Sequence, residues 1–342
     1  MLTKKEIREI NEFITNSSNP VYLYDNDPDG VCAYLVLKKY YKKGAGLPIK
    51  SYPSLNAASI EYIERHYPDL LIILDKAEVE QNFFDKSPCT VLWLDHHPLK
   101  QRSKVHYYNP LKHNKKDNRP TTYLVYSVAK SNLWLAMLGC ISDYYLPNFT
   151  DKFIKEFPGL ITEKNIDKII YNSEFGKLVK IISFNLKGKK ELVKKSLECL
   201  EKIESPYEIL NSLTKEGKFL FDRSQYLSKE YNTLLNQAKE KLTKEKILLF
   251  IYPEQETSFT ADLAGELKYL YPDKIVIVGR EKENYITMSL RTAKINIERI
   301  LGKALIGIEG YGGGHKFACG ASVKKEDFER FIENIKQEIK KR

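Results

Sequence analysis

The stretch YLYDNDPDGVCAYLVLKKY, residues 22–40, joins an apolar run, an acidic turn and a second apolar run. The residues before Asp25 are β-branched and aromatic, as in a buried strand, whereas residues 31–41 are apolar and helix-like. Asp25, Asp27 and Asp29 occupy every second position of the turn. The stretch therefore predicts a strand, a turn and a helix, which places the aspartates where open α/β sheets bind ligands.

The aspartate spacing also matches the start of an EF-hand calcium loop. That loop requires D-x-[DN]-x-[DN]-G and a bidentate Glu at its twelfth position. Counting from Asp25, this position is Val36, and a strand rather than a helix precedes the loop. The stretch is therefore not predicted to be an EF-hand.

Length and composition indicate a globular protein with more than one domain. At 342 residues the chain is long for a single compact core. No run of about 18 apolar residues appears, and the first residues lack the apolar centre of a signal peptide. Five separated cysteines without a CxxC pair argue against a disulfide framework and against structural zinc. We therefore expect a cytoplasmic protein without membrane association.

The charge balance is strongly basic. A formal net charge of +10 favours a polyanionic partner, since clustered Lys and Arg release counterions from a phosphate backbone. A Lys-rich surface that is simply solvated explains the same charge equally well. The positive charge is stronger evidence for a polyanionic partner if the otherwise basic protein also contains a strongly acidic pocket.

Short apolar runs alternate with helix-like stretches through the first half of the chain. The predicted strands are residues 21–24, 70–74, 90–94 and 104–108. Such alternation is typical of a parallel α/β sheet. A second set of predicted strands lies at residues 247–252, 274–279 and 285–290, with a helix-like segment at 260–271.

Residues 182–246 differ from both sets of strands, because apolar residues recur there at helical spacing among many charges. This segment predicts a helical connector. We therefore predict an α/β fold in three parts: a parallel-sheet domain (1–185), a helical connector (186–246) and a smaller C-terminal α/β domain (247–342).

Acidic and histidine residues follow several of the apolar runs. Asp75 ends LLIILD, the triplet at residues 95–97 ends TVLWLDHH, and Asp143 follows WLAMLGCIS. If parallel strands precede them, these residues share one sheet edge with the acidic turn. The converging set is Asp25, Asp27, Asp29, Asp75, His96 and Asp143.

Carboxylates that converge in this way imply bound cations, because like charges otherwise neutralise one another by raising their pKa values. Carboxylate and imidazole ligands suit Mn²⁺ or Mg²⁺ better than structural zinc. The alternative for Asp75 or Asp143 alone is a helix cap, which is the commoner role of such a residue. The combination of the acidic turn with the triplet favours metal.

Taken in order, these motifs resemble the DHH phosphoesterase superfamily, which is named after the triplet found here at residues 95–97. The DxDxDG form at residues 25–30 is similar to the RecJ-like, archaeal-type nuclease branch. Family II pyrophosphatases and the oligoribonuclease phosphatases begin this motif with His and usually have Asp where Val31 stands here. The resemblance therefore implies a nuclease.

Two C-terminal segments extend the resemblance. GYGGGHKFACGASV, residues 310–323, looks like the GGGH motif of the DHH-associated domain, and MSLRT, residues 288–292, resembles its SxR segment. The glycines permit a backbone nest that aims N–H groups at an anion, although such a run alone is usually just a turn. The substrate-binding residues implied are Ser289, Arg291, Gly312, Gly313, Gly314 and His315.

The resemblance also assigns roles to the acidic set. Two Mn²⁺ or Mg²⁺ ions would be held by Asp25, Asp27, Asp29, Asp75, His96 and Asp143, with Asp75 as the bridge. Asp95 would orient a neighbouring histidine, and His97 would contact the scissile phosphate. A metal-activated water would then attack phosphorus.

Three functions are compatible with these motifs. The first is a metal-dependent exonuclease on single-stranded DNA or RNA. The second is an oligoribonuclease or nucleotide phosphatase that acts on very short substrates. The third is a replisome or helicase-associated scaffold with a GINS-like or repair-helicase partner, with or without nuclease activity. The sequence leaves polarity, DNA versus RNA, substrate length and oligomeric state open.

Overall fold

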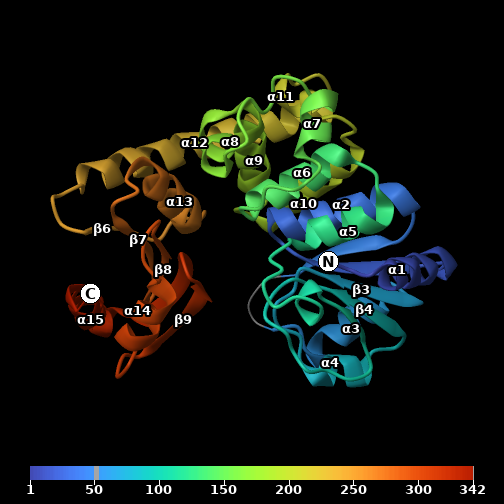
Figure 1. Ribbon diagram of the computed structural model, residues 1–342, viewed down its shortest axis with the longest axis horizontal. Coiled ribbons are helices and arrows are strands. Elements are labelled where there is room, and N and C mark those ends of the chain that lie inside the picture. Colours follow the sequence, from blue (N-terminus) through green and yellow to red (C-terminus); the bar gives the residue numbers. More distant parts are fainter. Residues whose placement is uncertain (50–53, 342) are drawn as a thin grey trace. The chain divides into compact units, whose positions relative to one another are not determined.

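Six consecutive buried residues, Pro20–Asp25, form strand β1 inside a parallel five-stranded sheet. The computed structural model describes residues 1–49 and 54–341 of the chain (Figure 1). The sheet has the order β2-β1-β3-β4-β5, and every pair of neighbours is parallel. The other strands are β2 (Ala45–Ile49), β3 (Leu70–Leu74), β4 (Thr90–Leu94) and β5 (His106–Tyr108).

Alternate residues of these strands enter two separate cores. Tyr22 and Tyr24 of β1 belong to the core shared with helices α2 (Pro28–Tyr41), α5 (Thr121–Ala129) and α6 (Leu133–Ser142). Val21 and Leu23 belong to a second core on the opposite face, where α3 (Ile60–Glu64) and α4 (Gln81–Lys86) lie (Figure 1). Because both faces are covered, the strands are continuous apolar runs rather than alternating ones.

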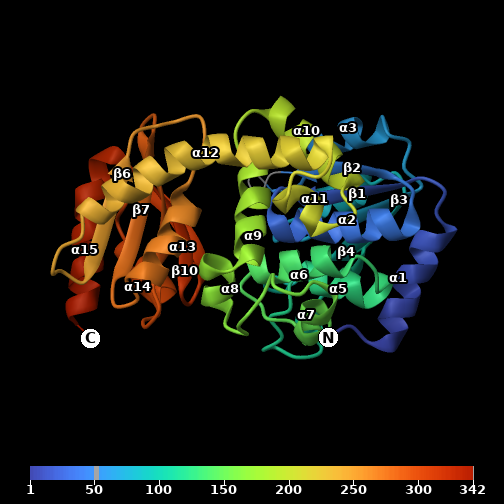
Figure 2. The same cartoon turned by 90° about the horizontal axis from the view of Figure 1, so that it is seen from above.

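Helix α2 packs against β1 and also against α5 and α6, which lie beside it (Figures 1 and 2). Its residues 29–37 are all buried, so it is enclosed rather than amphipathic. The remaining helices before residue 241 are α1 (Lys4–Asn16), α7 (Thr150–Glu156), α8 (Ile166–Asn172), α9 (Glu174–Asn185), α10 (Lys190–Lys202), α11 (Pro206–Leu210) and α12 (Lys215–Glu240).

The C-terminal part forms a second sheet, of order β6-β7-β8-β10-β9. Only β6 and β7 are parallel, and the other neighbours are antiparallel. The strands are β6 (Ile247–Tyr252), β7 (Ile275–Lys282), β8 (Tyr285–Arg291), β9 (Gly310–His315) and β10 (Ala318–Lys324). Helices α14 (Ile297–Ala304) and α15 (Phe328–Lys340) share one core with this sheet, and α13 (Thr260–Leu270) packs on β7 and β8.

The chain divides into two compact units. The first contains residues 1–186 and 191–224, and the second contains residues 187–190 and 225–342. The predicted connector is mostly helical and is divided between the units: residues 186 and 191–224 join the first, and residues 187–190 and 225–246 join the second. No helix among the described residues is long and apolar enough to cross a membrane.

The predicted α/β class is confirmed, and the bounds of the predicted strands lie within three residues of the observed ones. Strands β9 and β10 were not predicted as strands, and neither was β2. Its residues Gly46 and Pro48 have low strand propensity, but the strand lies at the sheet edge, where proline is tolerated. The run at Gly312–Gly314 was expected to form a nest, and this expectation is wrong: the run is extended in the edge strand β9.

Candidate metal centre

Three neighbouring strands of the parallel sheet end in acidic residues. β1 ends at Asp25, while Asp75 and Asp95 directly follow β3 and β4. The N–H groups of Asp75 and Asp95 continue the ladder by donating to the carbonyls of Leu94 and Tyr108, at 3.0 and 3.1 Å. The strand order reverses between β1 and β3, so these aspartates lie at the switch point where α/β sheets bind ligands.

The acidic turn forms the start of α2. Asp27 caps this helix by accepting a hydrogen bond of 2.9 Å from the N–H of Gly30. A Cβ atom at Gly30 would lie 2.4 Å from the carbonyl oxygen of Asp25, so the turn requires glycine there. Asp29 lies in the first helical turn, where the helix dipole favours an anion. The predicted strand, turn and helix are therefore present.

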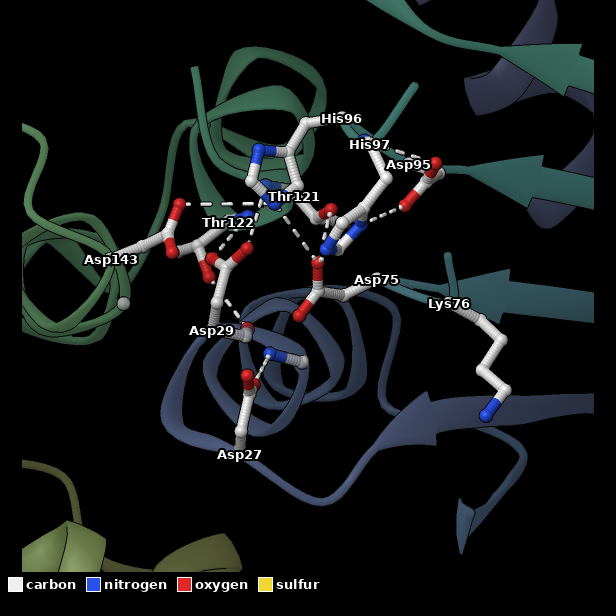
Figure 3. Close-up of polar contacts among 12 residues, drawn as sticks. Asp27, Asp29, Asp75, Lys76, Asp95, His96, His97, Thr121, Thr122 and Asp143 are labelled. Carbon is white, nitrogen blue, oxygen red and sulfur yellow. Dashed lines mark hydrogen bonds and ion pairs between the residues drawn. The ribbon is translucent and has the colours of Figure 1, made fainter. Parts of the chain in front are cut away.

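Asp29 is held by the N-terminus of a second helix (Figure 3). Its Oδ2 accepts from the N–H of Thr121 at 2.8 Å, and its Oδ1 accepts from the N–H of Thr122 at 2.9 Å. The cap residue of α5, Pro120, makes no side-chain capping bond. Asp29 thus caps α5 from another part of the chain. Two of the four carboxylate lone pairs are used, so two can face a cation.

Asp75 is buried, with an exposed fraction of 2%, and its φ of 57° is in the left-handed region. Few residues other than glycine adopt this conformation, and aspartate tolerates it better than most. The hydroxyl of Thr121 donates to Asp75 Oδ1 at 3.1 Å. Thr121 therefore contacts Asp29 with its backbone and Asp75 with its side chain.

Asp95 is completely buried and orients His97. Its Oδ1 lies 2.8 Å from His97 Nδ1, and its Oδ2 accepts from the backbone N–H of His97 at 3.1 Å. Asn109 and Tyr107 also approach Oδ2, each at 3.4 Å. Because Nδ1 faces Asp95, Nε2 is the nitrogen of His97 that can act on another group.

His96 lies between two carboxylates. Its Nε2 is 3.4 Å from Asp75 Oδ1 and 3.8 Å from Asp143 Oδ2 (Figure 3). Asp143 was expected at a strand end, and this detail is wrong, because the apolar run before it is helix α6. It occupies the C-cap of that helix, where the helix dipole disfavours an anion. A nearby cation would compensate this position.

Two triplets have ligand atoms close enough to share an ion. One comprises Asp75, His96 and His97, and the other comprises Asp29, His96 and Asp143, with the ligand atoms of each lying within 4.8 Å of one another. His96 occurs in both triplets, but one ring nitrogen can bind only one ion. If two ions bind, the carboxylates of the two triplets would therefore be divided between them. His97, which was predicted to contact substrate, appears in a triplet; its role stays a prediction.

Asp25 and Asp27 lie beside these triplets rather than in them. Burial is the largest cause of the raised pKa of Asp75. The charges of Asp95 and Asp25 also raise this pKa, and the charge of His97 lowers it. Asp27 is exposed and its carboxylate caps α2. Their predicted role as metal ligands therefore stays a prediction, while Asp29, Asp75, His96 and Asp143 come together.

Crowding shifts the protonation of the buried members. Burial and the charge of Asp75 raise the pKa of Asp29 to about 7, although His96 and the bonds to Thr122 oppose this. The pKa of Asp75 is raised to about 6, mainly by burial. Burial lowers the pKa of His96. Burial also opposes the imidazolium of His97, but the bond to Asp95 and the charges of Asp95, Asp75 and Asp143 raise its pKa to about 10.

The raised carboxyl pKa values are consistent with a cation-binding centre. Burial and neighbouring negative charges disfavour the ionised carboxylates, and divalent ions would stabilise them. Carboxylate oxygens with one or two imidazole nitrogens are ligands that suit Mn²⁺ and Mg²⁺. The residues present therefore fit the implied metals.

Four residues beside the centre were missed from sequence. Lys76 is buried and its pKa is lowered by burial, against the charges of Asp25 and Asp75. The others are Thr121, Thr122 and Asn109. The Pro-Thr-Thr that precedes an apolar run is a helix-start signal, but nothing in it points to an aspartate 92 residues away.

The predicted substrate residues of the second unit come together on one sheet. Gly320 of β10 pairs with Ser289 of β8 on one side and with Gly313 of β9 on the other. Ala318 likewise pairs with Arg291 and with His315, so the latter two are in one cross-strand row. A row shares one face of a sheet. Among the residues that the structure describes, no heavy atom beyond the chain neighbours lies within 4 Å of a Cβ built at Gly313, so the backbone there is open.

Comparisons with known families match both units. The model of the DHH family N-terminal domain matches residues 21–148, and that of the DHHA1 domain matches residues 247–341. No curated protein matched the chain in sequence.

Solved structures share the fold at low identity. RecJ in complex with Mn²⁺ from Thermus thermophilus has a TM-score of 0.71 at 16% identity, over 100% of this chain and 55% of that chain. An exonuclease RecJ bound to manganese has a TM-score of 0.65 at 16% identity, over 98% and 94%. CDC45 from Entamoeba histolytica has a TM-score of 0.50 at 9% identity, over 97% and 98%. The chain thus spans about half the length of the Thermus protein.

Proposed function

The chain belongs to the DHH superfamily, and we propose that it is a RecJ-like exonuclease that hydrolyses single-stranded DNA or RNA with two Mn²⁺ or Mg²⁺ ions. One observation carries this proposal: the carboxylates of Asp29, Asp75 and Asp143 gather around His96 at the switch point of the sheet. Such a cluster, with raised carboxyl pKa values, suits a divalent-metal phosphodiesterase.

Bound divalent metal would supply an acidified water and would neutralise charge on the phosphate. The chain's own residues do the positioning. Asp95 keeps His97 protonated at neutral pH, so that His97 Nε2 can donate to a phosphate oxygen. Asp75, with its carboxylate near both triplets, is the proposed bridge between ions.

The second unit is proposed to hold the nucleic acid. Arg291 supplies a guanidinium suited to a phosphate, and His315 lies in the same cross-strand row. The exposed glycine strand β9 lets a backbone approach without side-chain obstruction. Together with Ser289, these groups form the proposed substrate surface.

The same centre would serve an oligoribonuclease or nucleotide phosphatase, so substrate length must be tested. Purified protein should be assayed with Mn²⁺ and with Mg²⁺ on 5′- and 3′-labelled DNA and RNA, from dinucleotides to long strands. We expect stepwise shortening of long single strands from one end. Cleavage of dinucleotides with long strands left intact would overturn the exonuclease proposal in favour of the short-substrate enzyme.

Variants of the centre provide the control for this assay. Asp75→Ala and His96→Ala should abolish turnover while leaving the fold largely intact by circular dichroism. If both variants keep Mn²⁺-dependent activity, the site assignment is wrong.

A scaffold function would not need a metal centre, so the gathered carboxylates and histidines support the enzyme over a scaffold alone. A replisome partner is nevertheless compatible with nuclease activity, and we propose a GINS-like or helicase protein as a binding partner. Co-purification of tagged protein from its native cell extract tests this proposal, and recovery without any such protein would count against it.

A further inference from the structure

Helix α5 begins at the metal centre with two fully buried threonines, Thr121 and Thr122. Their backbone N–H groups bind both oxygens of Asp29, at 2.8 and 2.9 Å. Their hydroxyls differ in target: that of Thr121 donates to the carboxylate of Asp75 at 3.1 Å, and that of Thr122 donates to the backbone carbonyl of Asp29 at 2.8 Å. Both threonines therefore bind residues of the candidate centre, but only Thr121 reaches a second carboxylate with its side chain.

Thr121 contacts one member of each candidate triplet. Asp29 belongs to one triplet and Asp75 to the other. The hydroxyl bond reaches Asp75 Oδ1, the same atom that lies 3.4 Å from His96 Nε2. Because Thr121 and His96 approach the same oxygen, loss of the hydroxyl would leave the plane of the Asp75 carboxylate free to turn about its Cβ–Cγ bond. The backbone of Thr121 meanwhile binds Asp29, so this one residue links the two aspartates.

Thr122 acts on a third carboxylate through packing. A Cβ atom at Gly139 of α6 would lie 2.2 Å from Thr122 Oγ1, so α6 meets α5 at a glycine there. One helical turn later, the N–H of Asp143 donates to the carbonyl of Gly139 at 3.2 Å. The contact between Thr122 and Gly139 thus sets how closely α6, which ends at Asp143, packs on α5.

We propose that Thr121 is a positioning residue of the metal centre, whose hydroxyl holds the Asp75 carboxylate in the orientation that binds metal. The inference rests on the metal centre that the proposed function requires, but not on the identity of the substrate. Groups that orient a ligand from outside the coordination sphere typically change metal affinity by about 10- to 100-fold.

The test compares Thr121→Val with Thr121→Ser and with the control Ser127→Ala. Thr121→Val and Ser127→Ala each remove one buried hydroxyl of α5 and keep every backbone N–H, but the Ser127 hydroxyl donates within the helix, to the carbonyl of Tyr123 at 3.0 Å. Mn²⁺ binding to metal-free full-length protein is measured by isothermal titration calorimetry, and the free energy of unfolding by denaturant without metal. We expect Thr121→Val to weaken Mn²⁺ binding by about 10- to 100-fold and Thr121→Ser to restore it.

Ser127→Ala should bind Mn²⁺ within a few-fold of the unmodified protein. Equal loss of Mn²⁺ affinity in Thr121→Val and Ser127→Ala, unchanged affinity in Thr121→Val, or no restoration by serine would each overturn the proposal. Thr121→Ala carries the same test if the valine variant does not fold, since alanine is smaller and favours helix. Because binding is measured without substrate, absence of nuclease activity would overturn the proposed function and leave this inference intact.

Discussion

At the residue scale, Asp95 sets the charge state of His97. The completely buried carboxylate has His97 Nδ1 at 2.8 Å and receives the His97 N–H at 3.1 Å. Burial alone would favour neutral imidazole, but the bond to Asp95 and the surrounding carboxylates raise the pKa of His97 to about 10. His97 is therefore a cation at neutral pH, which is the form that attracts a phosphate.

Asp95→Asn should lower the pKa of His97 toward its ordinary value of about 6.5, because the amide removes the stabilising negative charge. The measurement is a titration of the His97 ring by nuclear magnetic resonance on metal-free protein. Asp117→Asn, which removes a different buried carboxylate of the same unit, is the control and should leave this pKa unchanged. A raised pKa that survives in Asp95→Asn would show that Asp95 is not its source.

The pKa values of Asp29 and Asp75 predict how metal binding depends on pH. Both exceed their ordinary value, at about 7 and about 6, so the folded metal-free protein holds protons that the unfolded chain has lost. The stability that these two groups contribute is complete below their ordinary pKa and falls as pH rises through the folded values. Metal must displace those protons, so its affinity should increase over the same range.

We therefore expect the Mn²⁺-induced rise in Tm to be small near pH 5 and to grow until about pH 8. Differential scanning calorimetry at fixed Mn²⁺ concentration measures this increment. An increment that is constant with pH would contradict the protonation states assigned to the two aspartates.

The residue contacts of the centre were the least predictable from sequence. The acidic turn and the triplet at residues 95–97 stand out because they combine several aspartates with histidines after predicted strands, whereas a single aspartate there is ordinary as a helix cap. Thr121 carries no such signal, since threonine is ordinary at a helix start. Its link to Asp29 joins residues 92 positions apart and exists only once α2 and α5 pack together.

At the element scale, strands β1, β3 and β4 were predictable and α6 was not. The strands are short, fully apolar and bounded by polar residues, as expected for a sheet covered on both faces. The α6 segment is also fully apolar, and periodicity cannot distinguish a buried helix from a buried strand. Asp143 was predicted to lie near the other acidic residues at the end of a strand. It does lie near His96, but at the end of a helix.

The packing of α5 on α6 depends on a single glycine. Gly139→Ala would place a Cβ atom 2.2 Å from Thr122 Oγ1, so α6 must move and carry Asp143 with it. We expect overpacking to cost about 1–3 kcal/mol of unfolding free energy. Mn²⁺ affinity should fall as well. Chemical denaturation and calorimetric Mn²⁺ titration measure the two effects.

Gly302→Ala is the matched control for this prediction. Gly302 also lies within a helix, α14, but no heavy atom beyond the helix backbone lies within 4 Å of its built Cβ. Alanine should be neutral or stabilising there by up to about 1 kcal/mol, as expected for a helix interior. Equal stability changes in the two variants would mean that the α5–α6 contact is not tight.

At the scale of the whole molecule, the candidate site residues are divided between two units. The carboxylate cluster belongs entirely to the first unit, and the row of Arg291 and His315 belongs to the second. Each unit has its own sheet and its own hydrophobic core. A substitution in one unit can therefore change its own function without disturbing the fold of the other.

This separation predicts that a variant in one unit changes substrate binding and a variant in the other changes metal binding. If Arg291 binds substrate as proposed, Arg291→Ala should raise the KM for a single-stranded oligonucleotide and leave Mn²⁺ affinity unchanged, because Arg291 lies in a different unit from the carboxylate cluster. Asp75→Ala should abolish Mn²⁺ binding and turnover. Steady-state kinetics and calorimetric Mn²⁺ titration distinguish the two patterns.

Arg299→Ala provides the control for charge, since it removes an equal charge from an exposed position on α14 in the same unit. If the net charge of +10 merely attracts the nucleic acid, both arginine variants should raise KM equally, and added salt should remove the difference from the unmodified protein. If Arg291 contacts a phosphate directly, its variant alone should lose affinity, with a shallower salt dependence. An unchanged KM in Arg291→Ala would exclude that residue from the substrate surface.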